Sequence, residues 1–320
     1  MSGGIQGVRG GTGWAQAPEL DEPSQTPAQA REARRAQAVS SGGGLSLQPV
    51  YEDGQVNVVS DEPLSSAQAR ALAQRIEAAY AYDAAEQRWR DGGPLHTPLT
   101  VAVLSAQAFA RVTGDASGST AGVTAGPNLF VVPDSVLGRR QPQAEDTIAH
   151  ELSHVQDFRE AGPRLASVPI YLQEGKAYLL GDRYPQKEGL GNPHVAYVAQ
   201  QLGALTARDA AAVMTHFREP QDETPGAFGF IGEVTGSLYV EFLRTRLGGT
   251  GFPDALERVA DTVAAVGRGV SYEQAFVQRF GLPPADAERA FVRYIGETEG
   301  RPDERLRGTV YASARRTSAA

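Results

Sequence analysis

The chain contains no cysteine among its 320 residues. This absence excludes disulfide bonds, thiolate metal sites, iron–sulfur clusters and cysteine nucleophiles. Any metal ion must therefore be bound by histidine, aspartate or glutamate side chains. Lysine is also scarce, because Lys176 and Lys187 are the only lysines among the 30 basic residues.

Excess positive charge and long apolar runs are also missing. The 38 acidic residues outnumber the 30 basic ones and give a net charge of -8, with an isoelectric point near 5.3. Such a chain has no overall positive field for nucleic acid, so we expect no nucleic-acid partner. No segment approaches the roughly 20 apolar residues of a membrane helix, so we expect no membrane span. The first residues lack the features of a secretory signal, which predicts a cytoplasmic protein or one exported by a signal-less route.

Both ends of the chain are poor in side chains that build a core. Residues 1–47 are rich in Gly, Ser, Pro, Gln, Ala and Arg, which predicts a disordered N-terminal arm. Residues 299–320 have the same polar character and predict a flexible tail. Between them we expect an α/β part over residues 48–162 and a helical part over residues 163–298.

The order of the predicted elements gives the fold class. Short runs rich in β-branched residues predict strands at 55–60, 99–105 and 128–132, and helical spacing predicts a helix over 65–90. From Gln143 onward nearly everything has helical periodicity, and we expect helices at 143–160, 169–181, 195–203, 206–217, 229–247, 252–266, 271–280 and 284–296. Strands followed by helices favour an α+β fold over a doubly wound sheet.

One short motif carries recognisable chemistry, the H-E-x-x-H pattern of His150-Glu151-Leu152-Ser153-His154. Its setting favours a helix, because Pro142 suits the first helical position and Gly162 ends the segment. On such a helix the two histidines project from one face, one turn apart, and their imidazoles can bind the same zinc ion. Glu151 points aside and is suited to act as general base on a zinc-activated water.

A catalytic zinc ion needs a third protein ligand and an open fourth position. The candidate is Glu174, twenty residues after His154 on the next predicted helix. Asp182, two turns further along, is the runner-up. The metzincin continuation would require a glycine and a third histidine where this chain has Asp157 and Glu160, so that class is excluded.

HELSH followed at this spacing by Glu174-Gly175-Lys176-Ala177 resembles the gluzincin metallopeptidases, the superfamily of thermolysin and related aminopeptidases. Residues 50–298 are similar to small bacterial peptidase-MA-like domains. The resemblance implies a zincin-like fold with a small twisted N-terminal sheet, a helix that carries HExxH and a mostly helical C-terminal subdomain. It also implies that His150, His154 and Glu174 bind the zinc ion.

The chain departs from that family at two positions. Thermolysin-like enzymes place an aspartate four residues after the third ligand to orient a zinc histidine, whereas this chain has Tyr178. Asp182 or Asp157 could take that role. Family members often carry a tyrosine where this chain has Glu233-Val234. The residue that stabilises the oxyanion therefore stays open, and the candidates are Tyr171, Tyr178, Tyr239, His194 and His216.

In zincins the substrate backbone pairs with an edge of the sheet above the active helix. The segment Asn128–Val132 is our candidate for that edge. Gly122 and Gly126 would allow close approach there, and an exposed loop explains these glycines equally well. His96 belongs to a proline-rich loop, and we assign it no role.

These observations predict a zinc-dependent metallopeptidase with one zinc ion per chain, Glu151 as general base, and a protein or peptide substrate. Two alternatives remain open. The chain could be a binding or regulatory protein that keeps zinc without turnover, although such a site would not need Glu151. It could also be a protease effector exported without a signal, with the N-terminal arm serving delivery.

Overall fold

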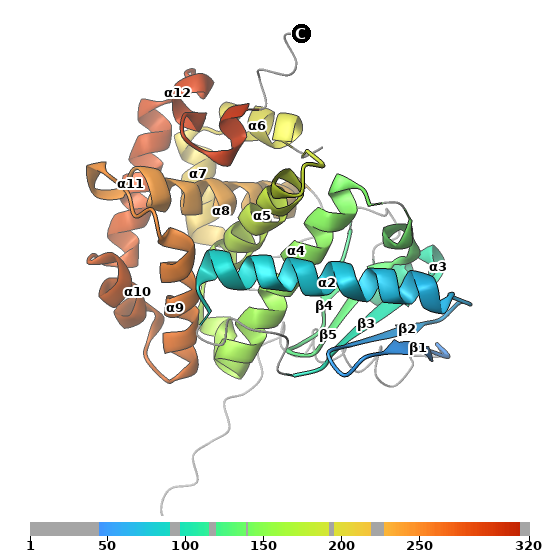
Figure 1. Cartoon of the computed structure of the whole chain (residues 1–320). Helices are drawn as coiled ribbons and strands as arrows, with labels where there is room; N and C mark the ends of the chain where they lie inside the picture. The colour runs from blue at the N-terminus through green and yellow to red at the C-terminus, as the bar shows by residue number, and fades with distance from the viewer. Residues whose placement is uncertain are drawn as a thin grey trace, which may run out of the picture.

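A computed structural model describes residues 45–89, 97–114, 120–138, 140–191, 195–218 and 227–313 (Figure 1). The predicted N-terminal arm up to residue 44 lies outside these residues, as do His96 and His194. The described part is a mixed α+β structure, as the sequence predicts, with a sheet toward its N-terminal end followed by a long succession of helices.

The sheet has five strands in the order β1-β2-β3-β5-β4. Their bounds are Gln48–Glu52 for β1, Val56–Ser60 for β2, Leu99–Leu104 for β3, Val123–Thr124 for β4 and Leu129–Pro133 for β5. The three inner strands β2, β3 and β5 are parallel, and β1 and β4 add to the two edges in antiparallel orientation. The predicted strands correspond to β2, β3 and β5, whereas the two edge strands were not predicted.

Alternate side chains of β3 pack on opposite faces of this sheet, as the period of two in a strand requires. Val101 and Val103 belong to the main core, which also includes the buried faces of the long helices. Ala102 and Leu104 face a smaller cluster on the other side. Phe109, on the short helix α3 (Ala106–Thr113), covers that smaller cluster. The sheet is therefore covered by helices on both faces, but chiefly on the face toward the main core.

The long helices follow the predicted ranges closely. Their bounds are Ser66–Gln87 for α2, Pro142–Ala161 for α4, Ile170–Lys187 for α5, Val195–Ala204 for α6, Ala207–His216 for α7, Ala227–Thr245 for α8, Ala255–Gly267 for α9, Tyr272–Phe280 for α10 and Pro284–Glu297 for α11. Helices α6 to α11 gather on one side of the molecule, and α4 and α5 lie between them and the sheet (Figure 1). Among the described helices, none combines the length and hydropathy needed to cross a bilayer.

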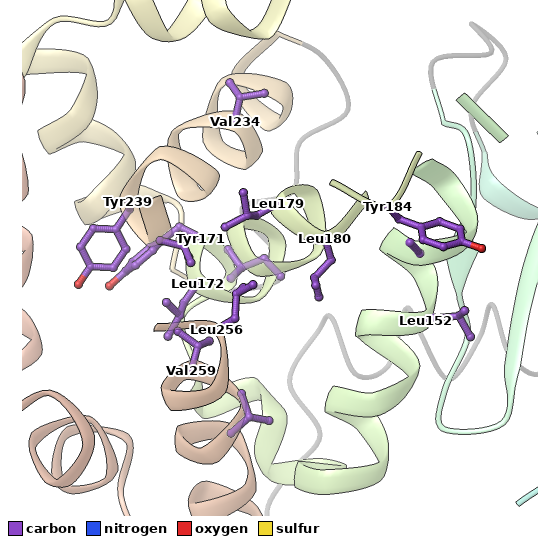
Figure 2. Close-up of a cluster of buried hydrophobic side chains, with 14 of the residues drawn as sticks. Leu152, Tyr171, Leu172, Leu179, Leu180, Tyr184, Val234, Tyr239, Leu256 and Val259 are labelled. Atoms are coloured by element: carbon purple, nitrogen blue, oxygen red, sulfur yellow. The ribbon is translucent and has the colours of Figure 1, made fainter. Parts of the chain in front are cut away.

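The main core continues from the sheet into the helical part. Leu172 and Leu180 on α5 and Val259 on α9 are fully buried, and Figure 2 shows their side chains in the helical part of the core. Leu152 on α4 is also fully buried, and its side chain points away from α5 (Figure 2). Because α4 and α5 pack against each other within this core, their relative positions are fixed, and with them those of the polar side chains that the two helices carry.

The predicted substrate-binding edge is wrong in detail. Asn128–Val132 corresponds to β5, which is paired on both sides, with β3 and with β4. The edge of the sheet on this side is instead formed by the two-residue strand β4, which directly contacts α4. A strand this short leaves almost no periodic pattern in the sequence, and Gly126 falls in the turn that reverses the chain, with a φ angle of 133°.

The predicted flexible tail also differs from the structure. Helix α12 (Pro302–Leu306) and the 3-10 turn η5 (Val310–Ser313) fold back onto the helical part. The fully buried Arg305 side chain donates hydrogen bonds to the main-chain oxygens of Leu202, Leu205 and Ile295 at 2.6 to 2.9 Å. Polar composition suggested fraying, but one buried guanidinium satisfies several helix-end carbonyls and anchors this segment.

Candidate metal centre

Helix α4 carries both histidines of the motif on one face. Pro142 occupies the first turn and Glu145 adds a negative charge near the N-terminal end. Ile148, Leu152 and Val155 are fully buried and dock the opposite face against the core. Because that apolar face is fixed, the histidine face must point toward α5.

Helix α5 brings the third predicted ligand and crosses α8 at very close range. An added Cβ on Gly175 would lie 2.2 Å from the carbonyl carbon of Gly236, and one on Gly236 would lie 2.2 Å from the main-chain oxygen of Tyr171. No side chain fits at this crossing, so glycine on both helices permits the contact. The crossing fixes the position of Glu174, the residue that precedes Gly175.

The structure brings His150, His154 and Glu174 together into a group that could hold a metal ion. The two histidine Nε2 atoms are 3.1 Å apart. Nε2 of His150 lies 3.3 Å from Oε2 of Glu174, and Nε2 of His154 lies 3.3 Å from Oε1 of Glu174. Three ligands at the ordinary zinc distance in a tetrahedral site would be about 3.3 Å from one another. The spacing of the donor atoms therefore fits a small tetrahedral ion.

The three side chains are mostly enclosed, with exposed fractions of 17% for His150 and 12% each for His154 and Glu174. Burial alone would lower the pKa of His154, but the charge of Glu174 and its hydrogen bond raise it to about 10. The pKa of His150 is raised for the same reason against the same burial effect. Burial would raise the pKa of Glu174, and the two histidines hold it well below its ordinary value. In the metal-free protein the two histidines and Glu174 therefore carry opposite charges that attract one another. A bound metal cation would take the place of the histidine protons.

Glu151 lies beside this cluster and is held by the edge of the sheet. Thr124 Oγ1 donates a hydrogen bond to Glu151 Oε2 at 2.7 Å and also lies 2.9 Å from the main-chain oxygen of Glu151. Gly122, just before strand β4, also lies close, since an added Cβ there would be 2.9 Å from Glu151 Oε1. The charge of Glu151 also contributes to the raised pKa values of His150 and His154. The predicted general base is therefore next to the predicted ligands.

Of the residues that could support the ligands, Tyr178 and Asp157 lie beside the two histidines and Asp182 does not. The ring of Tyr178 packs edge-on against that of His150, with centroids 5.1 Å apart. Asp157 is buried, lies close enough to His154 to raise its pKa, and forms an ion pair with Lys176. Asp182 lies outside the ligand cluster of the described residues and interacts with Tyr311 and with Asp146. The prediction of Asp182 as an alternative ligand is therefore wrong.

Three of the candidate oxyanion donors lie away from the cluster. Tyr171 and Tyr239 pack against each other deep in the helical part, with ring centroids 5.6 Å apart (Figure 2). The Tyr171 hydroxyl donates to Glu288 at 2.5 Å. His216 is exposed at the C-terminal end of α7, outside the cluster. His194 lies outside the described residues. Among the described candidates, Tyr178 is the one that borders the histidines.

The sequence analysis did not single out two acidic residues that lie near the site. Glu233 on α8 accepts a hydrogen bond from the Tyr178 hydroxyl, and burial together with the charge of Glu174 raises its pKa to about 7. Asp146 lies one turn before His150, and burial and Asp182 raise its pKa to about 8. The sequence offers a faint sign of Glu233, because it stands where the resembled family often has a tyrosine. For Thr124 and Asp146 it offers none.

Comparison with protein-family models gives no match for this chain, and comparison with curated proteins gives none either. The class of the molecule is therefore defined by its fold and site alone. It is an α+β protein with a buried two-histidine, one-carboxylate cluster that could hold a metal ion.

Proposed function

We propose that this chain is a zinc-dependent peptidase of the gluzincin type. The observation that carries the proposal is the position of Glu151 beside three convergent donors, His150, His154 and Glu174. Two imidazoles and one carboxylate form a ligand set that zinc accepts, and three protein ligands leave one coordination position open for chemistry. A purely structural site would not need a second acidic side chain at its margin.

When bound, a zinc ion supplies Lewis acidity that polarises a carbonyl group and lowers the pKa of a water molecule. His150, His154 and Glu174 would hold the ion. The carboxylate of Glu151 would accept the proton of the attacking water and pass it to the nitrogen of the leaving amine. Peptide hydrolysis needs this proton transfer because an amine is a poor leaving group until it is protonated.

The developing oxyanion requires a further hydrogen-bond donor, which contributes roughly 3 to 4 kcal/mol in comparable sites. We assign this role to Tyr178, because its ring lies against His150. Its hydroxyl donates to Glu233 in this structure and would have to turn from Glu233 to the oxyanion when substrate is bound, since it has one proton to donate. In the resembled family this position carries an aspartate that orients a zinc histidine. Tyrosine carries no carboxylate charge and cannot accept a histidine proton as that aspartate does. We therefore propose that Tyr178 acts on the substrate carbonyl and does not orient a histidine.

The edge strand β4 gives the substrate a place to bind. It ends the sheet and pairs only with β5 within the described residues, so its outer edge can accept an extended peptide as a further strand. Thr124 of this strand touches Glu151. A peptide paired with β4 would therefore pass the general base, which supports a protein or peptide substrate.

A peptide-library digest tests the proposed function. We expect the wild-type protein to cleave peptides, a chelator to abolish cleavage and added zinc to restore it. The Glu151→Gln variant should bind zinc normally and lose activity by roughly 10²-fold to 10⁴-fold, the usual contribution of a general base. Stoichiometric zinc without any cleavage by the wild type would instead support a non-catalytic zinc-binding protein.

A further inference from the structure

Thr124 and Glu151 form a contact that joins the edge of the sheet to the active helix. Both residues are 6% exposed, so the hydrogen bond between Thr124 Oγ1 and Glu151 Oε2, 2.7 Å long, is shielded from solvent. A hydroxyl donor to a carboxylate at this length is a strong, charge-assisted hydrogen bond. It links residues 27 positions apart in the sequence.

The contact distinguishes the two carboxylate oxygens of Glu151. Oε2 accepts the Thr124 hydroxyl, whereas no donor among the described residues reaches Oε1. Oε1 lies on the side of Gly122, where an added Cβ would be only 2.9 Å away. Gly122 therefore leaves room around Oε1, and Thr124 fixes the rotation of the carboxylate that presents it.

The same hydroxyl also reaches the main chain of Glu151. Thr124 Oγ1 lies 2.9 Å from the main-chain oxygen of Glu151, so one side chain of the edge strand contacts both the main chain and the carboxylate of this residue.

We infer that Thr124 is a positioning residue for the general base, which orients Glu151 so that Oε1 faces the attacking water. This inference rests on the proposed peptidase function. It adds a residue from the edge strand to the machinery, and it places the residue next to the peptide that would pair with β4. Gly122 contributes to the same arrangement, because it leaves room around Oε1 of Glu151.

Three variants test the inference. Thr124→Val keeps the shape of the side chain and removes the hydroxyl, and we expect kcat to fall roughly 10-fold to 100-fold with KM changed less than about twofold. Thr124→Ser keeps the hydroxyl and should retain activity within about threefold. Thr262→Val is the matched control, because its buried hydroxyl also donates to a main-chain oxygen but lies on α9. It should leave kcat unchanged.

A measurement on metal-free protein separates this inference from the proposed function. In a double-mutant cycle, Thr124→Val should lower the midpoint of urea unfolding in the wild-type background and have a smaller effect in a Glu151→Ala background. Thr124→Ala replaces Thr124→Val if the latter does not fold. If the wild type hydrolyses no peptide, the proposed function fails while the cycle still tests the contact. Equal midpoint shifts in both backgrounds, an unchanged kcat in Thr124→Val, or an equal loss in Thr124→Ser would overturn the inference.

Discussion

Lys176 and Asp157 form an ion pair that is almost completely buried, with exposed side-chain fractions of 0% and 2%. Asp157 lies three residues after His154 on α4, and Lys176 lies two residues after Glu174 on α5. The pair therefore joins the helix of the two histidines to the helix of the third predicted ligand, next to the point where these ligands meet.

Replacement of Lys176 by methionine should destabilise the protein strongly. The change leaves the Asp157 carboxylate buried without its partner, and removal of one partner of such a pair costs about 3 to 5 kcal/mol. Urea unfolding of the metal-free protein measures the loss. Lys187→Met is a suitable control because it removes the only other lysine, which is exposed and lies 4.7 Å from the Tyr82 ring. That variant should lose no more than about 1 kcal/mol, and comparable losses in both would contradict the account.

The metal-free protein should be most stable between about pH 4.5 and 6.5. Contact with Glu174 raises the pKa of His154 from 6.5 to about 10, so its contribution is complete below pH 6.5 and is lost as the pH rises toward 10. The pKa of Glu174 is lowered from 4.5, so its contribution is present above pH 4.5 and is lost as the pH falls below that value. Unfolding free energies at pH 5.5, 8 and 10 test this, and Glu174→Gln should flatten the profile. A wild-type stability that does not fall between pH 6.5 and 10 would argue against this network.

Substitution of Glu174 should weaken metal binding, whereas substitution of Asp182 should not. Glu174→Ala removes one of the three convergent donors, and we expect zinc affinity to fall by more than roughly 10²-fold. Asp182→Asn changes a buried acid two turns further along α5 that faces Asp146 and Tyr311. Competition with a colorimetric chelator gives both affinities. Normal affinity in Glu174→Ala would remove this residue from the metal site.

An alanine at the crossing of α5 and α8 should disturb both stability and the metal site. In Gly236→Ala, the new Cβ would lie 2.2 Å from the main-chain oxygen of Tyr171, so the helices must separate. Forced overpacking of this kind costs about 1 to 3 kcal/mol. Gly296→Ala on α11 is the control, because its new Cβ would meet only Ala207 Cβ at 3.4 Å. Thermal unfolding and zinc affinity should fall in the first variant alone, and equal behaviour of the two would refute the close crossing.

Much of the fold was predictable because its signals are local. The helix of the motif has an apolar stripe and a clear start and stop, so α4 was expected at 143–160 and is observed at Pro142–Ala161. Glu174 was the candidate third ligand on the next predicted helix, and the resemblance to gluzincins implied that it meets the two histidines. The structure brings these three side chains together.

The remaining features depend on contacts that spacing does not encode. Strand β4 has two residues, too few for any periodicity, so the edge of the sheet was assigned to β5 instead. Thr124 approaches Glu151 only because β4 folds over α4, and Glu233 approaches the site only because α8 crosses α5 at Gly175. The tail appeared polar by composition, yet Arg305 buries its charge against main-chain oxygens of other helices.

The most direct test of the account is a titration of zinc into metal-free protein, in which the rate of peptide hydrolysis is followed at each addition. The account predicts that the rate rises linearly and stops at one zinc ion per chain, and that Glu151→Gln binds the same amount of zinc without gaining activity. A rate independent of zinc, or full activity in Glu151→Gln, would contradict it.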